Sequence, residues 1–302
     1  MRYTGEQYEL RAGSYAAIVT EGGARLRSLT FDGRPLVASF AADALPPVSR
    51  GAVLAPWPNR IADGRYSFAG QPHQLPINEP SRMTALHGLV AWAPWTLAPQ
   101  SDDAATLRCR IWPTDGYPFL LDLEIAYLLT ADGLTIRLSA VNAGDRNAPY
   151  GCSIHPYLVA GPGRIDEWTL RLPAHDYLDV DELRLLPVGV RPVEGTQFDF
   201  RTPTQIGARQ IDHAMAGLEF DADGRCSAQL VHPDGRGVEM SWDSGCRWVQ
   251  LHTADRPEPE LDRAGLAFEP MTCPPNAFAS GEGLIELPPG ESTTTSWVIS
   301  AL

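Results

Sequence analysis

Asp-Gly dipeptides recur along this chain, each close to a short run of β-branched or aromatic residues. The Asp-Gly pair suits the tight turns of β-hairpins, because the central residues of these turns require positive φ angles. The recurrence therefore predicts a series of antiparallel strands joined by tight turns. The pairs are Asp32-Gly33, Asp63-Gly64, Asp132-Gly133, Asp223-Gly224 and Asp234-Gly235.

The segments between these pairs have the pattern of strands. Residues 121–125 and 134–138 alternate apolar and polar side chains, which gives a strand one buried and one wet face. No stretch of a dozen residues has the 3.6-residue apolar period of a helix, and 27 prolines with 27 glycines would interrupt most helices. The sequence thus predicts an all-β fold with long loops. The expected strands are 15–19, 26–31, 106–112, 121–129, 134–142, 168–172, 238–242, 247–253 and 293–300.

Domain organisation follows from what the chain lacks. A length of 302 residues allows one large β domain or two ordinary ones. The sequence contains no repeat of 20 to 50 residues, no low-complexity tract and no block of charge that would mark a linker. The Pro-rich segment 254–261 is short and polar, and strand-like sequence continues on both sides of it. We expect residues 1–302 to form a single domain.

Charge and composition exclude several functions. A net charge of −13 argues against nucleic acid or an anionic membrane as a partner, since both require clustered positive charge. It also disfavours acidic substrates. All 24 basic residues are arginine, so the chain has no lysine for a Schiff base or for a P-loop.

The cysteines and the amino-terminal residues bear on the cellular compartment. Five widely spaced cysteines without a C-x-x-C pair indicate neither a disulfide framework nor a zinc site. The first residues, Met1 to Glu6, form no apolar run of the kind found in signal peptides, and no segment approaches the length of a membrane span. We expect a cytoplasmic protein.

Two segments carry residues suited to proton transfer. In residues 268–278, Glu269 lies between an aromatic residue and a proline, and further prolines follow, so the carboxylate is held stiffly. In residues 150–157, His155 precedes Pro156, which favours an extended backbone at the histidine. A rigidly held carboxylate and a rigidly held imidazole are a candidate base and acid.

Two further segments concentrate polar side chains among Pro, Gly and Trp: residues 56–60 (Pro-Trp-Pro-Asn-Arg) and residues 86–89 (Leu-His-Gly-Leu). In this order, and together with the Phe-Asp-Phe-Arg run at 198–201 and Ile211-Asp212, the four segments resemble the aldose 1-epimerase family of galactose mutarotase-like enzymes. The resemblance extends over nearly the whole chain. It implies a large antiparallel β-sandwich of the galactose mutarotase-like type, with the sugar bound in a cleft on its concave face.

The resemblance implies a role for each candidate residue. Glu269 is similar to the base that takes the proton of the anomeric hydroxyl, and His155 to the acid that protonates the ring oxygen. Opening of the ring, rotation about the C1–C2 bond and reclosure then give the other anomer. The residues expected to bind the sugar are Asn59, Arg60, His87, Asp212, Gln250, His252 and Trp57, with Trp92 and Tyr157 as further aromatic surfaces.

This chemistry needs two positioned groups and neither a metal nor an organic cofactor. The expected partner is a small-molecule sugar, bound by a monomer or a homodimer, and the expected activity is that of an aldose mutarotase for a free hexose or pentose. The chain has Leu89 where many members have a second glycine after His-Gly, and Met271-Thr272-Cys273 where many have glutamine. These differences concern the choice of sugar more than the type of reaction.

Two alternative functions remain at this stage. The substrate of the first is a hexose 6-phosphate, which requires converging arginines, and Arg60, Arg82 and Arg247 are the candidates. The second is a non-catalytic carbohydrate-binding protein with the same fold. A paired acid and base argues against the second, because binding alone does not require one.

Single residues also have simpler interpretations. Arg60 could be a structural ion-pair partner, Trp57 could belong to the core, and Asp212 could cap a turn before His213. A loop carboxylate paired with an arginine is the corresponding alternative for Glu269.

Overall fold

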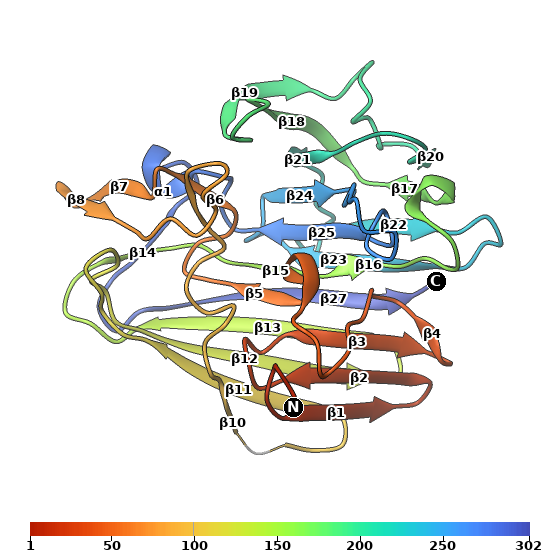
Figure 1. Cartoon of the computed structure of the whole chain (residues 1–302), viewed down its shortest axis with the longest axis horizontal. Helices are drawn as coiled ribbons and strands as arrows, with labels where there is room; N and C mark the ends of the chain where they lie inside the picture. Colours follow the sequence, from red (N-terminus) through yellow and green to blue (C-terminus); the bar gives the residue numbers. More distant parts are fainter. Residues whose placement is uncertain (99) are drawn as a thin grey trace.

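The computed structural model describes residues 1–98 and 100–302 of the chain. Within these residues, three larger antiparallel sheets and four two-stranded ladders make up the fold (Figure 1). The nine-stranded sheet has the order β10 (Thr96–Leu97), β11 (Ala104–Ile111), β12 (Leu121–Thr130), β13 (Gly133–Asn142), β27 (Ser292–Ala301), β23 (Gly237–Asp243), β22 (Arg225–Val231), β17 (Thr169–Arg171) and β20 (Thr204–Gln205).

Two smaller sheets and the ladders complete the strands. The six-stranded sheet has the order β16 (Tyr157–Leu158), β25 (Leu266–Met271), β24 (Trp248–His252), β21 (Asp212–Leu218), β18 (Ala174–Val180) and β19 (Pro187–Pro192). The four-stranded sheet contains β1 (Gln7–Ala12), β2 (Tyr15–Thr20), β3 (Leu26–Phe31) and β4 (Arg34–Pro35). The ladders pair β14 (Ala148–Tyr150) with β26 (Ile285–Leu287), β15 (Ser153–His155) with β5 (Ala52–Leu54), β6 (Arg60–Ala62) with β9 (Thr84–Leu86), and β7 (Arg65–Phe68) with β8 (Gln71–Gln74).

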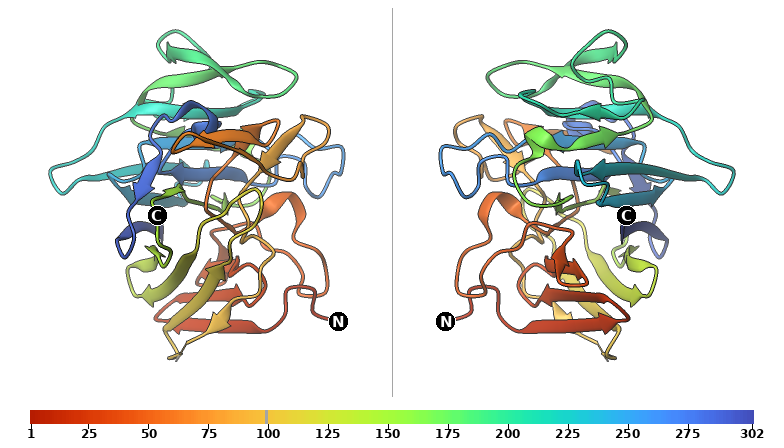
Figure 2. Two further views of the ribbon diagram at one scale, coloured as in Figure 1. Left: turned by 90° about the vertical axis from the view of Figure 1, so that its left-hand side faces the viewer. Right: turned by 90° about the vertical axis from the view of Figure 1, so that its right-hand side faces the viewer.

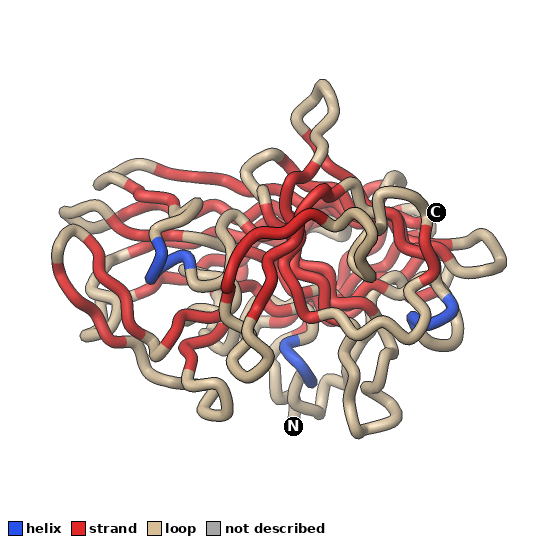
Figure 3. The backbone as a smooth tube through the Cα atoms, turned by 90° about the horizontal axis from the view of Figure 1, so that it is seen from above, coloured by secondary structure: helices blue, strands red, loops and turns tan. Residues whose placement is uncertain are grey.

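Helix is scarce in the described residues, as Figure 3 shows. It is confined to α1 (Ala277–Ser280) and to the 3-10 turns η1 (Pro47–Ser49) and η2 (Ile165–Glu167). None of these segments has the length and apolar character that crossing a membrane requires.

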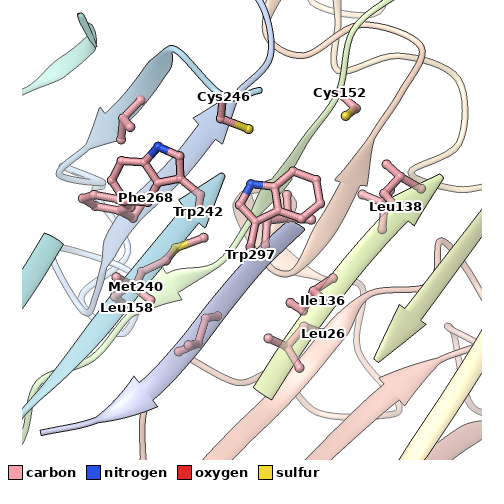
Figure 4. Close-up of a cluster of buried hydrophobic side chains, with 14 of the residues drawn as sticks. Leu26, Ile136, Leu138, Cys152, Leu158, Met240, Trp242, Cys246, Phe268 and Trp297 are labelled. Atoms are coloured by element: carbon pink, nitrogen blue, oxygen red, sulfur yellow. The ribbon is translucent and has the colours of Figure 1, made fainter. Parts of the chain in front are cut away.

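One face of the nine-stranded sheet is covered by both smaller sheets. Strands β1 and β2 pack over β11 and β12, and β25 packs over β23 and β27, as the side views of Figure 2 help to follow. The second contact is formed by Phe268, whose ring centroid lies 5.7 Å from that of Trp242, and by Trp297, whose indole N–H donates to the Pro270 carbonyl at 3.2 Å (Figure 4). Burial of a side chain such as Phe268 contributes about 1.5–3 kcal/mol. The layers confirm the predicted all-β sandwich.

The alternating pattern produces this arrangement directly. In β12 the buried positions are 121, 123, 125, 127 and 129, while the residues between them face outward, as a strand with a period of two requires. Each of the nine predicted strands overlaps an observed one. The outer face of the nine-stranded sheet carries charged pairs such as Arg110 with Asp122, beside exposed apolar side chains such as Leu128 and Val141.

Two of the five predicted hairpin turns are wrong. Asp63-Gly64 joins β6 to β7, which pair with β9 and β8 instead of with each other. Asp223-Gly224 follows β21 and precedes β22, which belong to different sheets. Both Asp-Gly pairs still form tight turns with positive φ at the glycine. The predicted turns are therefore present, but the strands on either side of each turn do not pair with each other. A tight turn reverses the chain, but the partner of each strand is selected by packing between sheets.

Candidate active site

Four of the predicted residues share one face of the six-stranded sheet. In the register of this sheet, Gln250 lies opposite Glu269, and Asp212 lies opposite His252. Side chains that are directly opposite, or two positions apart on one strand, project from the same face. The neighbouring residue on β25, Phe268, projects into the core. Strand alternation therefore separates the polar site from the apolar core by a single residue.

A second wall comes from the ladder of β6 and β9. Arg60 begins β6, and His87 follows β9 directly. Asn59 and His87 both have positive φ angles, 55° and 64°, and the His87 N–H donates to the Asn59 carbonyl at 3.0 Å. A left-handed conformation at a residue other than glycine costs of order 1–3 kcal/mol and is frequent at functional sites. Gly88 follows with φ 73°, and a Cβ there would lie 2.1 Å from the Ala55 carbonyl oxygen, so the turn excludes larger residues.

His155 is the last residue of β15 and closes the site from a third side. The carbonyl of the next residue, Pro156, accepts the Phe268 N–H at 3.0 Å, which ties this segment to β25. As a result His155 Nε2 lies 3.2 Å from Glu269 Oε1. The ring of Tyr157 stacks on the imidazole, with centroids 5.3 Å apart. The predicted acid and base are thus in contact.

These walls enclose a cavity of about 330 Å³, within the range of small-molecule sites. It is lined by Val48, Ser49, Asn59, Arg60, Glu79, Leu86, His87, His155, Tyr157, Asp212, His252, Arg256 and Glu269. Seven of the nine predicted site residues are in this lining. The lining residues come from eight separate stretches of the sequence.

The pKa of Glu269 is raised well above its ordinary value. Burial is the main cause, because the side chain is only 2% exposed and its charged form loses hydration. The negative charge of Asp212 raises this pKa further, whereas the positive charge of Arg60 lowers it. A carboxyl group with a raised pKa is suited to accept and return a proton near neutral pH.

The pKa values of the histidines in the cavity are shifted in the opposite direction. Burial lowers the pKa of His155 to about 3, and it lowers the pKa of His87 and of His252 as well. Burial penalises the charged form of each group, so it favours a neutral imidazole and a protonated carboxyl alike. In a contact as close as that of His155 and Glu269, the two groups titrate as one pair.

Polar atoms without a protein partner gather at this site. In the part of the chain that the structure describes, half of the buried side-chain nitrogen and oxygen atoms without a hydrogen bond belong to it. Buried polar atoms are nearly always satisfied in folded proteins, so a cluster of unsatisfied ones indicates a place where a ligand binds. The atoms are Glu269 Oε2, His155 Nδ1, His87 Nδ1, His252 Nδ1 and Gln250 Oε1.

Glu79 is a residue of the cavity that the sequence analysis missed. It receives two hydrogen bonds from Arg60, at 2.8 and 3.1 Å, and one from the Thr84 hydroxyl at 2.6 Å. Arg82 approaches it at 3.4 Å, and Arg60 in turn lies 3.9 Å from Asp212. Arg60 is therefore an ion-pair partner and a residue of the cavity wall at once. Glu79, like Glu269, precedes a proline, and this shared feature was the available signal.

Two predicted residues are absent from the lining of the cavity. Trp57 is buried at 2% exposure behind the cavity, with its ring 5.6 Å from that of Phe278, so its prediction as a sugar-binding surface is wrong. Gln250 is absent from the lining, but its amide donates to Asp212 Oδ1 at 2.7 Å and orients that carboxylate. Trp92 is 62% exposed, and the Arg25 guanidinium lies 4.6 Å from its ring. Of the aromatic candidates, Tyr157 reaches the cavity.

Comparison with known proteins identifies the relatives of the chain. A family model described as aldose 1-epimerase matches residues 6–300. The uncharacterized Escherichia coli protein YihR is 38% identical over 292 residues, which cover 96% of this chain and 92% of YihR. Mouse galactose mutarotase is 34% identical over 182 residues, covering 57% of this chain and 51% of the mouse protein.

Solved structures share the fold. The GalM/aldose epimerase homologue from C. elegans superposes with a TM-score of 0.86 at 20% identity, over 98% of both chains. Galactose 1-epimerase from Lactobacillus acidophilus gives a TM-score of 0.83 at 22% identity, over 98% of this chain and 94% of that one. At these identities the structural likeness shows that the chains have the same fold.

Proposed function

Because the chain belongs to the aldose 1-epimerase family, we propose that it interconverts the α and β anomers of a free hexose or pentose by acid–base ring opening and reclosure. One observation carries the proposal: Glu269 and His155 are buried, 3.2 Å apart, in a cavity of small-molecule size. The anomeric hydroxyl and the ring oxygen of a pyranose are both bonded to C1. A base and an acid that are this close can therefore act on the two oxygens of one sugar.

In this proposal Glu269 removes the proton of the anomeric hydroxyl while His155 delivers a proton to the ring oxygen. The bond between C1 and the ring oxygen breaks, and the electrons of the former O–H bond form the aldehyde carbonyl. Rotation about C1–C2 presents the other face of the aldehyde. Reclosure reverses both proton transfers and gives the other anomer, and the protein returns to its starting state without a cofactor.

Burial of the pair favours the neutral forms in which the opening step ends. The step begins with a charged carboxylate and a charged imidazolium, and it ends with both groups neutral. Burial raises the pKa of Glu269 and lowers the pKa of His155, so the surroundings favour the neutral forms. A positioned acid or base contributes about 10²- to 10⁴-fold to a rate, and two such groups suffice for a reaction of this kind.

The other residues of the cavity hold the sugar. Asn59, Arg60 and Asp212 present planar polar groups to hydroxyls, and His87 lies beside His155, with ring centroids 5.2 Å apart. The side chain of Tyr157 supplies an apolar surface for C–H groups. Glu79 keeps the guanidinium of Arg60 in place.

A sugar with an anionic group is a second candidate substrate, and one observation favours it. Arg256 lines the cavity and forms no ion pair within residues 1–98 and 100–302. The three arginines considered at the outset support it less. Arg60 and Arg82 both approach Glu79, and Arg247 is exposed and outside the lining. A phosphorylated hexose would thus meet one free guanidinium where such substrates generally require several.

Polarimetry tests the proposal. Freshly dissolved α-D-glucose, α-D-galactose and α-D-xylose are followed with and without the protein, beside glucose 6-phosphate. Faster relaxation of at least one free aldose than of glucose 6-phosphate is the expected result. Acceleration of the phosphorylated sugar alone would assign the site to anionic sugars. Binding of a sugar with no acceleration would assign the chain to the carbohydrate-binding proteins instead.

A further inference from the structure

Three metal-ligating side chains converge in the cavity. His87, His155 and Glu269 each offer one ligand atom, and these atoms all lie within 4.8 Å of one another. His155 Nε2 and Glu269 Oε1 are 3.2 Å apart. Among the residues that the structure describes, this is the one group of at least three His, Cys, Asp or Glu side chains that meets such a distance.

The convergence is built into the backbone. The three residues come from different segments, namely the turn after β9, the end of β15, and β25. The side chains of His155 and Glu269 are 6% and 2% exposed, and Glu269 Oε2 has no hydrogen-bond partner. A buried carboxylate oxygen thus lies beside two imidazoles, and no protein group forms the hydrogen bond that such an oxygen requires.

Two neutral imidazoles and one carboxylate are the ligands that Zn²⁺ and neighbouring divalent transition ions prefer. With metal–ligand bonds of about 2.0–2.2 Å in a tetrahedral site, adjacent ligand atoms lie about 3.3 Å apart. His155 and Glu269 already have this separation, and His87 has to approach them. All three residues line the cavity, so a water molecule or a sugar hydroxyl bound there would complete the coordination.

We propose that His87, His155 and Glu269 form a binding site for Zn²⁺ and related divalent transition ions, and that an ion bound there excludes the sugar. Binding of the ion stands apart from the proposed function, whereas inhibition by the ion rests on it. The ion engages the atoms that would exchange protons with the substrate.

The surface offers a matched control. His175 Nε2 and Glu219 Oε1 are 2.6 Å apart, a contact between the same two kinds of group, but the side chains are 48% and 64% exposed. No third ligand joins this pair in the described residues. A pair of this kind binds transition ions far more weakly than three converging ligands.

Titration with CoCl₂, followed by visible absorption, tests binding without reference to activity. We expect one equivalent to bind with the intense visible bands of four- or five-coordinate Co²⁺, and we expect excess ZnCl₂ to displace it. MgCl₂ should not, because Mg²⁺ prefers an octahedral shell of oxygen ligands. Outer partners of metal sites change affinity by about 10- to 100-fold. Loss of a direct ligand in Glu269→Gln or His155→Asn should therefore weaken Co²⁺ binding by at least about tenfold.

The variants decide the location of the ion. His175→Gln should bind Co²⁺ like the wild type, and circular dichroism with thermal unfolding confirms that each variant is folded. Equal affinity in the wild type and both site variants would overturn the proposal, as would an absence of visible bands. Loss of binding in His175→Gln would also overturn it, because the ion would then lie at the surface.

The mutarotation rate in the presence of Zn²⁺ provides the second test. With an aldose that the protein turns over, ZnCl₂ should slow mutarotation, EDTA should restore it, and a higher sugar concentration should weaken the inhibition. Full activity with the site saturated by Zn²⁺ would overturn the exclusion of sugar. Should no aldose react, the CoCl₂ titration still decides whether the ion binds.

Discussion

Two carboxyl groups of this protein, Asp122 and Glu269, have pKa values that are shifted in opposite directions. Asp122 lies on the outer face of the nine-stranded sheet, where it accepts two hydrogen bonds from Arg110, at 2.6 and 2.7 Å. This contact lowers the pKa of Asp122. Glu269 is buried beside His155, and burial raises its pKa. The same chemical group is therefore held as a stable anion in one place and is disfavoured as an anion in the other.

The difference shows what identifies a site in this fold. The outer face carries a hollow of about 560 Å³, larger than the cavity of about 330 Å³ at Glu269. The charges in that hollow are already matched, Arg110 with Asp122 and Arg108 with Glu124. Exposed pairs of this kind contribute little to stability and leave no group unsatisfied. Unpartnered buried polar atoms, and not the size of a hollow, distinguish the cavity.

The largest effect on the mutarotation rate should come from replacing the proposed acid, His155. His155→Asn keeps a polar side chain of similar size but removes the proton donor, so we expect mutarotation to slow by about 10²- to 10⁴-fold. Polarimetry with an aldose that the wild type turns over measures the effect. Activity within about twofold of the wild type, in a folded variant, would separate His155 from the chemistry.

A smaller effect should come from Glu79, which contacts the sugar-binding wall through Arg60. Glu79→Gln removes the negative charge that pairs with Arg60 and leaves one acceptor oxygen for two N–H groups, and hydrogen bonds to charged groups are worth about 1.5–3 kcal/mol each. We expect KM to rise by about tenfold or more while kcat changes little, because the acid and base are untouched.

Thr84→Val serves as the milder comparison for Glu79→Gln, since it removes one hydrogen bond to Glu79 and leaves the ion pair with Arg60 in place. Initial rates over a range of sugar concentrations separate the two constants. A fall in kcat with KM unchanged would contradict a positioning role for Glu79.

The charges around Glu269 should move the pH profile in opposite directions. The negative charge of Asp212 raises the pKa of Glu269, so Asp212→Asn lowers it and the limb of the kcat/KM profile that reports Glu269 shifts to lower pH. The positive charge of Arg60 lowers this pKa, so Arg60→Gln raises it and the limb shifts to higher pH. Rate measurements from pH 4 to 9 test the signs, and shifts in the same direction would contradict the assignment of Glu269 as the base.

The smallest effect should come from the outer face. Asp122→Asn breaks the exposed contact with Arg110, which is screened by water, so we expect the thermal midpoint and the mutarotation rate to stay close to those of the wild type. Calorimetry and polarimetry check both values. A loss of activity comparable with that of His155→Asn would mean that the outer face takes part in function.

Much of the architecture follows from local patterns in the sequence. Alternation predicted strands β12 and β13 of the nine-stranded sheet, because one face of each is buried and the other is wet. Strand β25 was not predicted as a strand, because all six of its residues are buried and the pattern Leu-Ala-Phe-Glu-Pro-Met does not alternate. Both faces of this strand are covered, one by the core and one by the cavity.

The sequence identified the segments that form the cavity, but it did not predict how their side chains are arranged relative to one another. Motifs named Glu269 and His155, but their contact at 3.2 Å depends on the pairing of strands that are more than 100 residues apart in the sequence. Glu79 was missed because a single Glu-Pro pair in a loop carries little signal. Trp57 was predicted to bind the sugar because it lies within a polar motif, but a tryptophan in such a motif packs into the core as readily as it faces a ligand.

The central claim is that the buried carboxylate, and not an exposed one, performs the chemistry. The most direct test is the polarimetric rate of Glu269→Gln beside Asp122→Asn, with the wild type as reference and thermal unfolding as the check of folding. The account predicts a loss of about 10²-fold or more in Glu269→Gln and none in Asp122→Asn. A folded Glu269→Gln variant that relaxes the sugar as fast as the wild type would contradict it.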